Sequence, residues 1–380
     1  MNAALEHLRD AVRAAAADGR RLRLRGGGSK DFWGAPLQGQ VLDTRAYQGI
    51  IAHEPSELVV TVRAGTPLAE LEAVLAQAGQ CLPFEPPHFG PQATVGGMVA
   101  AGLAGPARAT VGAVRDFVLG VRMLNGRAED LFFGGQVMKN VAGYDLSRVL
   151  AGSAGTLGVI TEVSLKVLPL APAECTLVCV GLAQPAALDL LHRWGGQPLP
   201  LNASAWVHDD SQVPAADTLF VRLRGAQAAV AAAQTRMAAD AQALGAQVTV
   251  RSDPAVAADW RASGEQTLPF FQAPSPQHAL WRLSLPQTAP ALDLPGPCYI
   301  EWQGAQRWVW APVSAAAALH ALAAQHGGHA LLFRASASGG AADKAAGVAS
   351  PLPAVALRLQ QQLQQQFDPH GVFATGRLGH

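Results

Sequence analysis

The chain has no excess of charge of either sign. Its 380 residues include 28 Lys plus Arg and 28 Asp plus Glu, which gives a formal net charge of zero. A protein without a net field exerts no general attraction on nucleic acid or on anionic lipid. We therefore expect no nucleic-acid partner.

Cysteine is scarce and scattered. The four cysteines, at positions 81, 175, 179 and 298, are too few and too dispersed for a disulfide framework or for ligating an iron–sulfur cluster. We interpret them as small, buried apolar residues.

Long apolar runs are missing too. No charge-free apolar run reaches the roughly 18 residues that a membrane-spanning helix needs. The N-terminal segment MNAALEHLRDAVRAAAADG lacks the apolar core of a signal peptide and predicts an amphipathic helix over about residues 3–18. These features predict a cytoplasmic protein and leave open a peripheral position on the inner face of the membrane through a complex.

Two common nucleotide-binding motifs are absent. Neither GGGSKD nor GSAGTLG matches G-x-G-x-x-G at the start of a helix with an acidic residue about 20 positions further on. The G-x-x-x-x-G-K-[ST] motif is absent as well. The sequence thus gives no support to a nicotinamide or ATP site.

Glycine, in contrast, gathers in three stretches of the first half. These are RGGGSK (25–30), TVGGMVAAGLAG (94–105) and GSAGTLG (152–158). Such loops can direct backbone N–H groups at phosphate, and their entropic cost is usually offset by a ligand. A flexible surface turn would explain one stretch. Three in one region favour a large dinucleotide whose pyrophosphate lies between two of them.

Composition changes after Pro169. Glycine becomes rarer, and seven of the eight tryptophans lie beyond residue 190, which indicates a second core. Three of them, Trp302, Trp308 and Trp310, belong to a predicted hairpin. This hairpin could be part of an exposed assembly surface, or its aromatic side chains could be core residues.

The order of the segments resembles a known family. The loop RGGGSK is followed by PPHFGPQATVGGMVAAGLAG, GAVRDFVLGVRMLNGR and KNVAGYDLSRVLAGSAGTLGVITEVSLKVLP. This order is similar to the FAD-binding domain of the vanillyl-alcohol-oxidase, or PCMH-type, family over about residues 20–170. The tail FDPHGVFATGR resembles that family's closing segment. The phrases LPFEPPHFG and VMKNVAGYDLSR most resemble the FAD-binding E subunits of bacterial glycolate oxidases.

This resemblance implies an α+β fold. Residues 1–170 would form a two-lobed PCMH-type FAD-binding domain, and residues 171–350 a mixed α/β cap domain on the substrate side. Residues 351–380 would form a helix and tail that return to the FAD domain.

The resemblance also implies which residues hold the cofactor. Members with covalent flavin often have a histidine in the first loop, where this chain has Ser29 and Lys30, so we expect non-covalent FAD. The implied FAD contacts are Gly26, Gly27, Gly28, Ser29, Lys30, Thr94, Gly96, Gly97, Gly152, Ser153, Gly155, Gly158 and the backbone of Ile160.

One family feature is missing. Relatives that oxidise 2-hydroxy acids carry a G-H-x-G-D-G-N-x-H-like motif whose histidines bind a metal. The nearest stretch here, HGGHALLFR (326–334), has no Asp, no Asn and no further His. A metal site needs three or four ligands, so we expect none, and the catalytic residues stay unassigned.

Several polar residues have both a functional and a structural interpretation. His88 and Arg334 could replace the missing base and cation, but a packing or surface role is favoured for each. The segment KNVAGYD, with Lys139, Asn140, Tyr144 and Asp145, could shape the wall above the flavin ring. A turn before a helix capped by Asp145 is favoured.

We therefore predict an FAD-binding subunit of a glycolate oxidase (glycolate dehydrogenase) complex that supports oxidation of glycolate to glyoxylate. The resemblance implies a second FAD-containing subunit that oxidises the small 2-hydroxy acid and an iron–sulfur subunit that accepts electrons. Two alternatives stay open: an autonomous FAD-dependent 2-hydroxy-acid dehydrogenase of the D-lactate type, and a non-catalytic scaffold that has lost its flavin.

Overall fold

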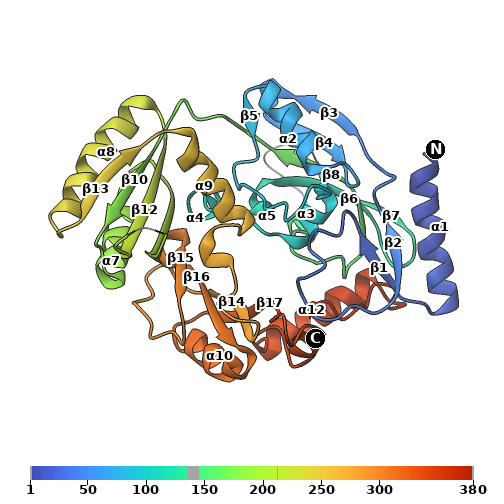
Figure 1. Cartoon of the computed structure of the whole chain (residues 1–380). Helices are drawn as coiled ribbons and strands as arrows, with labels where there is room; N and C mark the ends of the chain where they lie inside the picture. The colour runs from blue at the N-terminus through green and yellow to red at the C-terminus, as the bar shows by residue number, and fades with distance from the viewer. Residues whose placement is uncertain (1, 136–144, 212, 379–380) are drawn as a thin grey trace. The chain divides into compact units, whose positions relative to one another are not determined.

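The computed structural model describes residues 2–135, 145–211 and 213–378, and the chain folds into two compact units (Figure 1). The first unit comprises Met1–Ala104, Gly112–Leu170 and Pro351–His380. The second comprises Gly105–Val111 and Ala171–Ser350. The segment Gly105–Val111, which the sequence placed within residues 1–170, therefore packs in the second unit.

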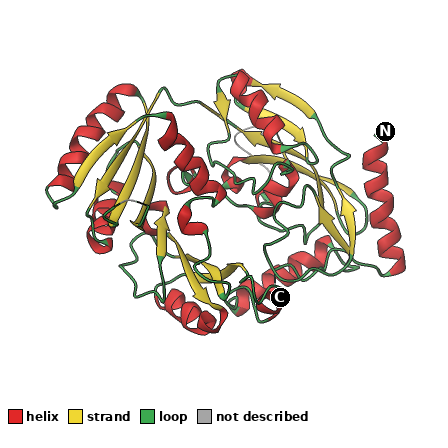
Figure 2. Cartoon of the chain, in the orientation of Figure 1, coloured by secondary structure: helices red, strands yellow, loops and turns green. Residues whose placement is uncertain are grey.

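A five-stranded antiparallel sheet forms the centre of the first unit (Figure 2). Its inner strands β4 and β8 are buried along almost their whole length, which suits their runs of β-branched and apolar residues. In sheet order the strands are β3 (Ile50–Glu54), β4 (Val59–Arg63), β8 (Val159–Lys166), β6 (Val118–Leu124) and β7 (Asp130–Gly134).

Shorter elements surround this sheet. Two further pairs of strands are β1 (Leu22–Arg25) with β2 (Gln40–Asp43), which are parallel, and β5 (Gln80–Cys81) with β9 (Leu168–Pro169), which are antiparallel. The helices of this unit are α1 (Ala3–Asp18), α2 (Leu68–Gln77), α3 (Val95–Ala101), α5 (Val114–Phe117), α6 (Leu146–Val149) and α12 (Ala354–Phe367).

Helix α1 confirms the amphipathic helix predicted at the N-terminus. Its buried face packs in one cluster with residues of β1, β2, β6 and β8 and with the C-terminal tail. This face consists of Leu5, Leu8, Val12 and Ala15. The tail contributes Val372 and Phe373, which are 0% and 1% exposed.

The end of α12 is held by the turn between β6 and β7. The Oδ1 atom of Asn125 accepts hydrogen bonds from the N–H groups of Arg127 and Glu129, both at 2.9 Å, and closes this turn. The N–H of Gly126 donates to the carbonyl of Phe367 at 2.8 Å. A Cβ at Gly126 would lie 2.8 Å from the Cα of Asp368, so only glycine permits this approach.

The second unit is built on an eight-stranded sheet whose neighbouring strands are all antiparallel. In sheet order the strands are β13 (Gln247–Arg251), β10 (Ala173–Val180), β12 (Ala216–Gly225), β11 (Leu201–Asp209), β15 (Cys298–Glu301), β16 (Gln306–Pro312), β14 (His278–Ser284) and β17 (His329–Arg334). Its helices are α4 (Arg108–Val111), α7 (Gln184–Gly195), α8 (Gln227–Gln242), α9 (Pro254–Glu265), α10 (Ala316–Gln325) and α11 (Ala341–Ala345).

Helices α7 and α8 pack on one face of this sheet. Leu177 and Cys179 of β10 join their apolar side chains in a single core, and Cys175 is buried beside them. The burial predicted for the cysteines is confirmed for Cys175 and Cys179, whereas Cys81 and Cys298 are only half-buried. Helix α9 packs on the opposite face, where the indole N–H of Trp260 donates to Oγ1 of Thr176 at 2.9 Å. Within the described residues, no helix is both long enough and apolar enough to cross a membrane.

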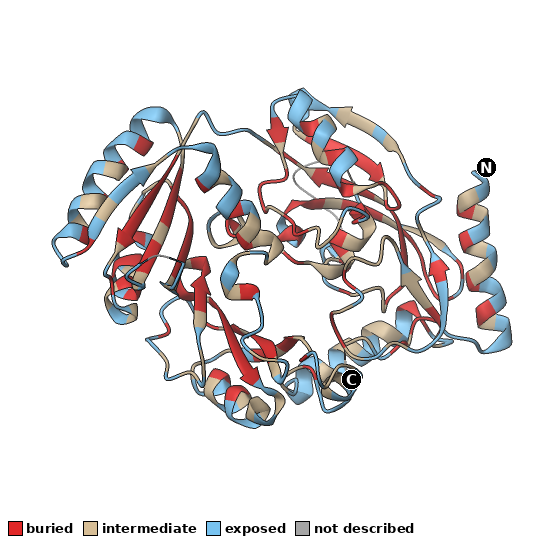
Figure 3. Cartoon of the chain, viewed as in Figure 1, coloured by how far each residue is buried: buried red, intermediate tan, exposed pale blue. Residues whose placement is uncertain are grey.

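The β15–β16 hairpin is buried along most of its length (Figure 3), and its tryptophans are core residues. Trp302, Trp308 and Trp310 are 8%, 4% and 4% exposed. The indole N–H of Trp302 donates to the carbonyl of Gly105 at 3.0 Å, and that of Trp310 to the carbonyl of Phe270 at 2.7 Å. The core interpretation is confirmed, and an exposed assembly surface at these side chains was wrong.

A buried carboxyl group ends strand β15. Glu301 is 5% exposed, and its Oε1 accepts hydrogen bonds from Nε1 of Trp308 at 2.8 Å and from Nε2 of Gln306. Burial raises the pKa of the Glu301 carboxyl to about 7, although both donors and the charge of Arg282 favour the ionised form. This side chain is therefore partly protonated near neutral pH.

The raised pKa predicts a specific pH dependence of stability. Between the ordinary value of 4.5 and about 7, the native protein holds the Glu301 proton more tightly than the unfolded chain does. This stabilisation is complete below pH 4.5 and is lost as the pH rises through 7. Glu301→Gln keeps the accepting oxygen but cannot titrate. In urea unfolding, the wild type should lose about 2 kcal/mol more than the variant between roughly pH 5 and pH 8. Equal losses in the two proteins would contradict this account.

Candidate functional site

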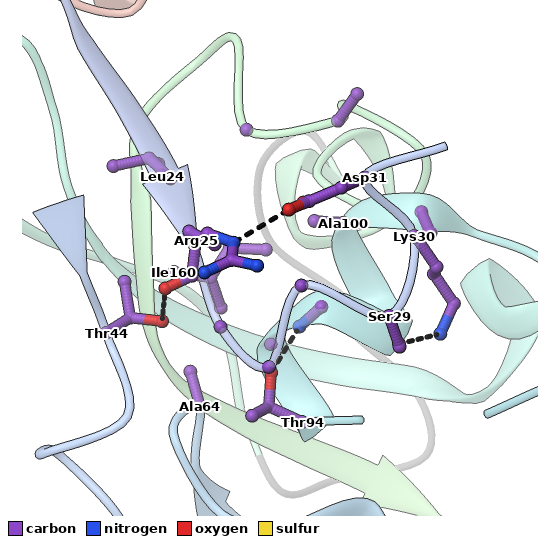
Figure 4. Close-up of a pocket in the computed structure, with 18 of the residues that line it drawn as sticks. Leu24, Arg25, Ser29, Lys30, Asp31, Thr44, Ala64, Thr94, Ala100 and Ile160 are labelled. Atoms are coloured by element: carbon purple, nitrogen blue, oxygen red, sulfur yellow. Dashed lines mark hydrogen bonds and ion pairs between the residues drawn. The ribbon is translucent and has the colours of Figure 1, made fainter. Parts of the chain in front are cut away.

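All three glycine-rich segments meet at one pocket in the first unit (Figure 4). The loop after β1, the N-terminal turn of α3 and the turn before β8 supply most of its wall. The lining residues are Leu24, Arg25, Gly26, Gly27, Gly28, Ser29, Lys30, Asp31, Trp33, Thr44, Ala64, Thr94, Gly96, Gly97, Ala100, Ala101, Ala154, Gly155, Gly158, Val159, Ile160 and Arg377.

The first loop needs glycine because it packs against the segment that enters α3. A Cβ at Gly27 would lie 1.5 Å from the carbonyl oxygen of Gln92, and one at Gly26 would lie 2.3 Å from Oγ1 of Thr94. Thr94 is the N-cap of α3, where its Oγ1 accepts a hydrogen bond from the N–H of Gly97 at 3.2 Å. The absent side chains thus bring two loops together, and the pocket lies where they meet.

The third glycine segment is held against α3 and β6. The N–H of Gly152 donates to the carbonyl of Val99 at 2.9 Å, and that of Ala154 to the carbonyl of Ala100 at 2.8 Å. Gly158 has a φ of 151°, and a Cβ there would lie 2.4 Å from the carbonyl oxygen of Leu124. These glycines allow backbone to pack against backbone and so fix the position of the turn that lines the pocket.

The pocket loop has free hydrogen-bond donors. Within the described chain, the backbone N–H groups of Gly27, Gly28 and Ser29 find no acceptor. Unpaired N–H groups of a glycine-rich loop form the kind of concavity that binds phosphate oxygens. The donor set therefore fits the diphosphate of a dinucleotide such as FAD.

The charged side chains around the loop differ in their partners. Arg25 pairs with Asp31 at 2.7 Å, so these two charges offset each other. Nζ of Lys30 donates to the carbonyl of His88 at 3.2 Å and lies 5.6 Å from the ring centroid of Phe89.

The predicted cofactor contacts are largely brought together. All of them line the pocket except Gly152 and Ser153, which lie in the adjoining turn. The pocket lining also includes Ala64, Ala100 and Arg377, which were not among the predicted contacts. Ala100 belongs to the small-residue run TVGGMVAAGLAG, and Arg377 to the tail that resembles the family's closing segment, so both could have been found. Nothing in the sequence marked Ala64.

The polar residues considered as substitutes for a base and a cation have structural partners. Nε2 of His88 lies 2.9 Å from Oε2 of Glu72. Arg334 donates from Nε and Nη2 to Oε1 of Gln266, at 3.1 and 3.0 Å, and burial lowers the pKa of its guanidinium to about 10. No group of three or more His, Cys, Asp or Glu side chains in the described ranges is placed to hold a metal ion.

The segment KNVAGYD is only partly described. Lys139, Asn140 and Tyr144 lie outside the described residues. Asp145 occupies the cap position of α6, but its side chain makes no hydrogen bond to the helix backbone. Its carboxylate instead accepts from Oγ of Ser147 at 2.8 Å and pairs with Arg148 at 2.8 Å.

Comparison with known proteins finds an FAD-binding domain in the part of the chain that carries the first two glycine segments. The family described as "FAD binding domain" matches residues 3–130. Glycolate oxidase subunit GlcE of Escherichia coli is 43% identical over 371 residues, which cover 98% of this chain and 96% of that protein. Glycolate oxidase subunit GlcD of Bacillus subtilis is 30% identical over 142 residues, 37% of this chain and 30% of that protein.

More distant relatives extend the comparison. The mitochondrial D-lactate dehydrogenase [cytochrome] of Arabidopsis thaliana is 32% identical over 145 residues, 38% of this chain and 25% of that enzyme. The solved structure of alkyldihydroxyacetonephosphate synthase aligns with a TM-score of 0.69 at 14% identity, over 97% of this chain and 74% of that one, which shows a shared fold. The predicted α+β fold, its PCMH-type FAD-binding domain and the FAD cofactor are confirmed. The chain belongs to the GlcE family of FAD-binding glycolate oxidase subunits.

Proposed function

We propose that this chain is the FAD-holding subunit of a glycolate oxidase complex and that it supports oxidation of glycolate to glyoxylate. The observation that carries the proposal is the pocket of three glycine segments with free N–H groups, in a chain that matches GlcE over 98% of its length. Bound FAD would supply the hydride acceptor for oxidation of a 2-hydroxy acid.

The chain's own residues would bind and orient the cofactor. Free N–H groups of Gly27, Gly28 and Ser29 would hold the diphosphate, and the small side chains of Ala64 and Ala100 would leave room for the rest of the molecule. The pocket lining as described contains no His, Cys or Tyr, the residues that could bond to flavin through a side chain. This supports non-covalent binding.

The same comparison supports a partner subunit. The relatives named GlcE and GlcD are both glycolate oxidase subunits, which supports assembly of this chain with a second FAD-containing subunit. We further propose an iron–sulfur subunit as electron acceptor, because the cysteines of this chain are dispersed and two of them are buried within one strand. Peripheral attachment to the inner face of the membrane would then depend on the assembled complex.

Ala100 offers a direct test of the pocket. Ala100→Leu adds three carbons to the lining, so it should reduce FAD affinity at least tenfold by occupying cofactor space. Affinity is measured by quenching of flavin fluorescence on binding. Ala76→Leu, an equal change at an exposed position of α2, is the control and should leave affinity unchanged. Wild-type FAD affinity in Ala100→Leu would refute the pocket assignment. Gly27→Val is less informative, because its Cβ would first displace Gln92.

The visible absorption spectrum of the purified chain tests its role in the complex. The protein supplied with FAD should show flavin bands, release all its flavin on acid precipitation, and keep the bands after anaerobic addition of glycolate. Bleaching by glycolate would instead establish an autonomous dehydrogenase. If no flavin is taken up, only a scaffold role is left.

A further inference from the structure

The C-terminal tail is firmly anchored in the first unit. The carboxylate of Asp368 accepts hydrogen bonds from the N–H of Val372 at 2.8 Å and from the N–H of Phe373 at 2.6 Å, which turns the chain back after α12. The side chains of Val372 and Phe373 are fully buried in the cluster beneath α1.

From this anchor the tail is bonded to both ends of the glycine loop that follows β1. Before the loop, the N–H of Leu22 donates to the carbonyl of Val372 at 2.7 Å. After the loop, the N–H of Ala35 donates to the carbonyl of Arg377 at 3.0 Å. The tail therefore fixes the distance between the two ends of the loop.

The side chain of Arg377 turns back to the loop itself. Its Nη2 donates to the carbonyl of Lys30 at 2.5 Å, and its guanidinium carbon lies 5.7 Å from the ring centroid of Trp33. Gly34 has a φ of 81°, and a Cβ there would lie 2.7 Å from the carbonyl oxygen of Arg377, so glycine permits the close approach. Arg377 lines the pocket together with the loop.

Among the described residues, Arg377 has no anionic partner of its own. Asp31, whose negative charge raises the pKa of Arg377, pairs with Arg25 at 2.7 Å. No carboxylate in the described part of the chain lies within ion-pair distance of the Arg377 guanidinium. Burial lowers its pKa, an effect that Asp31 opposes and Arg23 reinforces, so an anion in the pocket would stabilise the charged form.

We propose that Arg377 supplies a positive charge that binds the FAD diphosphate at this loop, and that the C-terminal tail holds the loop in its binding conformation. A guanidinium presents its donors in a planar fork that suits phosphate oxygens. The backbone N–H groups of Gly27, Gly28 and Ser29 contribute neutral donors, and Arg377 of the tail, more than 340 residues later in the chain, contributes a charged guanidinium. The tail segment that carries Arg377 is therefore part of the cofactor site.

Two variants separate the charge of Arg377 from its packing. Arg377→Lys keeps the charge and a long aliphatic stem, and Arg377→Met keeps only the stem. FAD dissociation constants of the full chain are measured by flavin fluorescence at several salt concentrations. We expect Arg377→Met to weaken FAD binding at least tenfold, with a shallower salt dependence than the wild type. Arg377→Lys should recover part of the affinity and most of the salt dependence.

The matched control removes a cation elsewhere. Arg13→Met changes the net charge equally at an exposed position of α1 and should change the dissociation constant less than twofold. Urea unfolding of the apoproteins checks that each variant is folded. Equal FAD affinity in Arg377→Lys and Arg377→Met would mean that the residue acts by packing alone, which would overturn the proposal. Wild-type FAD affinity in Arg377→Met would overturn it as well. The readout is cofactor binding, so the result is independent of whether glycolate is the substrate.

Discussion

The approach of Gly27 to Gln92 is the constraint on which the cofactor site depends. With only 1.5 Å between a notional Cβ and a carbonyl oxygen, no other residue allows these two loops to touch. Their contact places the loop after β1 beside the first turn of α3. The turn at 152–155, hydrogen-bonded to α3, adds the third wall. The glycines are thus required first by the protein's own packing, and the N–H groups that this packing leaves without an acceptor in the described chain are available to a ligand.

The C-terminal tail completes the same structure from the other end of the chain. Asp368 is held against Gly126 of the β6–β7 turn, and its carboxylate caps the turn that leads into Val372 and Phe373. Those two side chains share a core with α1, β1 and β2. A pocket whose lining extends from residue 24 to residue 377 can therefore form only when both ends of the chain have folded together.

The second unit has a different physical character. Its hairpin buries three tryptophans and Glu301, and hydrogen bonds satisfy their indole N–H groups. Burial of the Glu301 carboxyl costs free energy, and the two hydrogen bonds that its Oε1 accepts offset part of that cost. The remaining cost of burying the charged form raises the pKa of Glu301.

The sequence suggested His88 and Arg334 as a catalytic base and a substrate-binding cation. In the structure they are hydrogen-bonded to Glu72 and Gln266. This arrangement suits a chain that holds flavin while a partner subunit oxidises the substrate, as we propose.

The sequence by itself determined the local features. Apolar periodicity identified α1, and the three glycine stretches with their family resemblance pointed to FAD. Tertiary structure decided what depends on contacts between distant residues. It assigned Gly105–Val111 to the second unit and buried the tryptophan hairpin. It also brought Ala64 and Arg377 into the pocket lining, whereas Gly152 and Ser153 lie beside that lining. Periodicity and turn preference act over a few residues and can be read along the chain. Whether a side chain is buried, or which distant loop it meets, depends on neighbours hundreds of positions away and is fixed only when the whole unit packs.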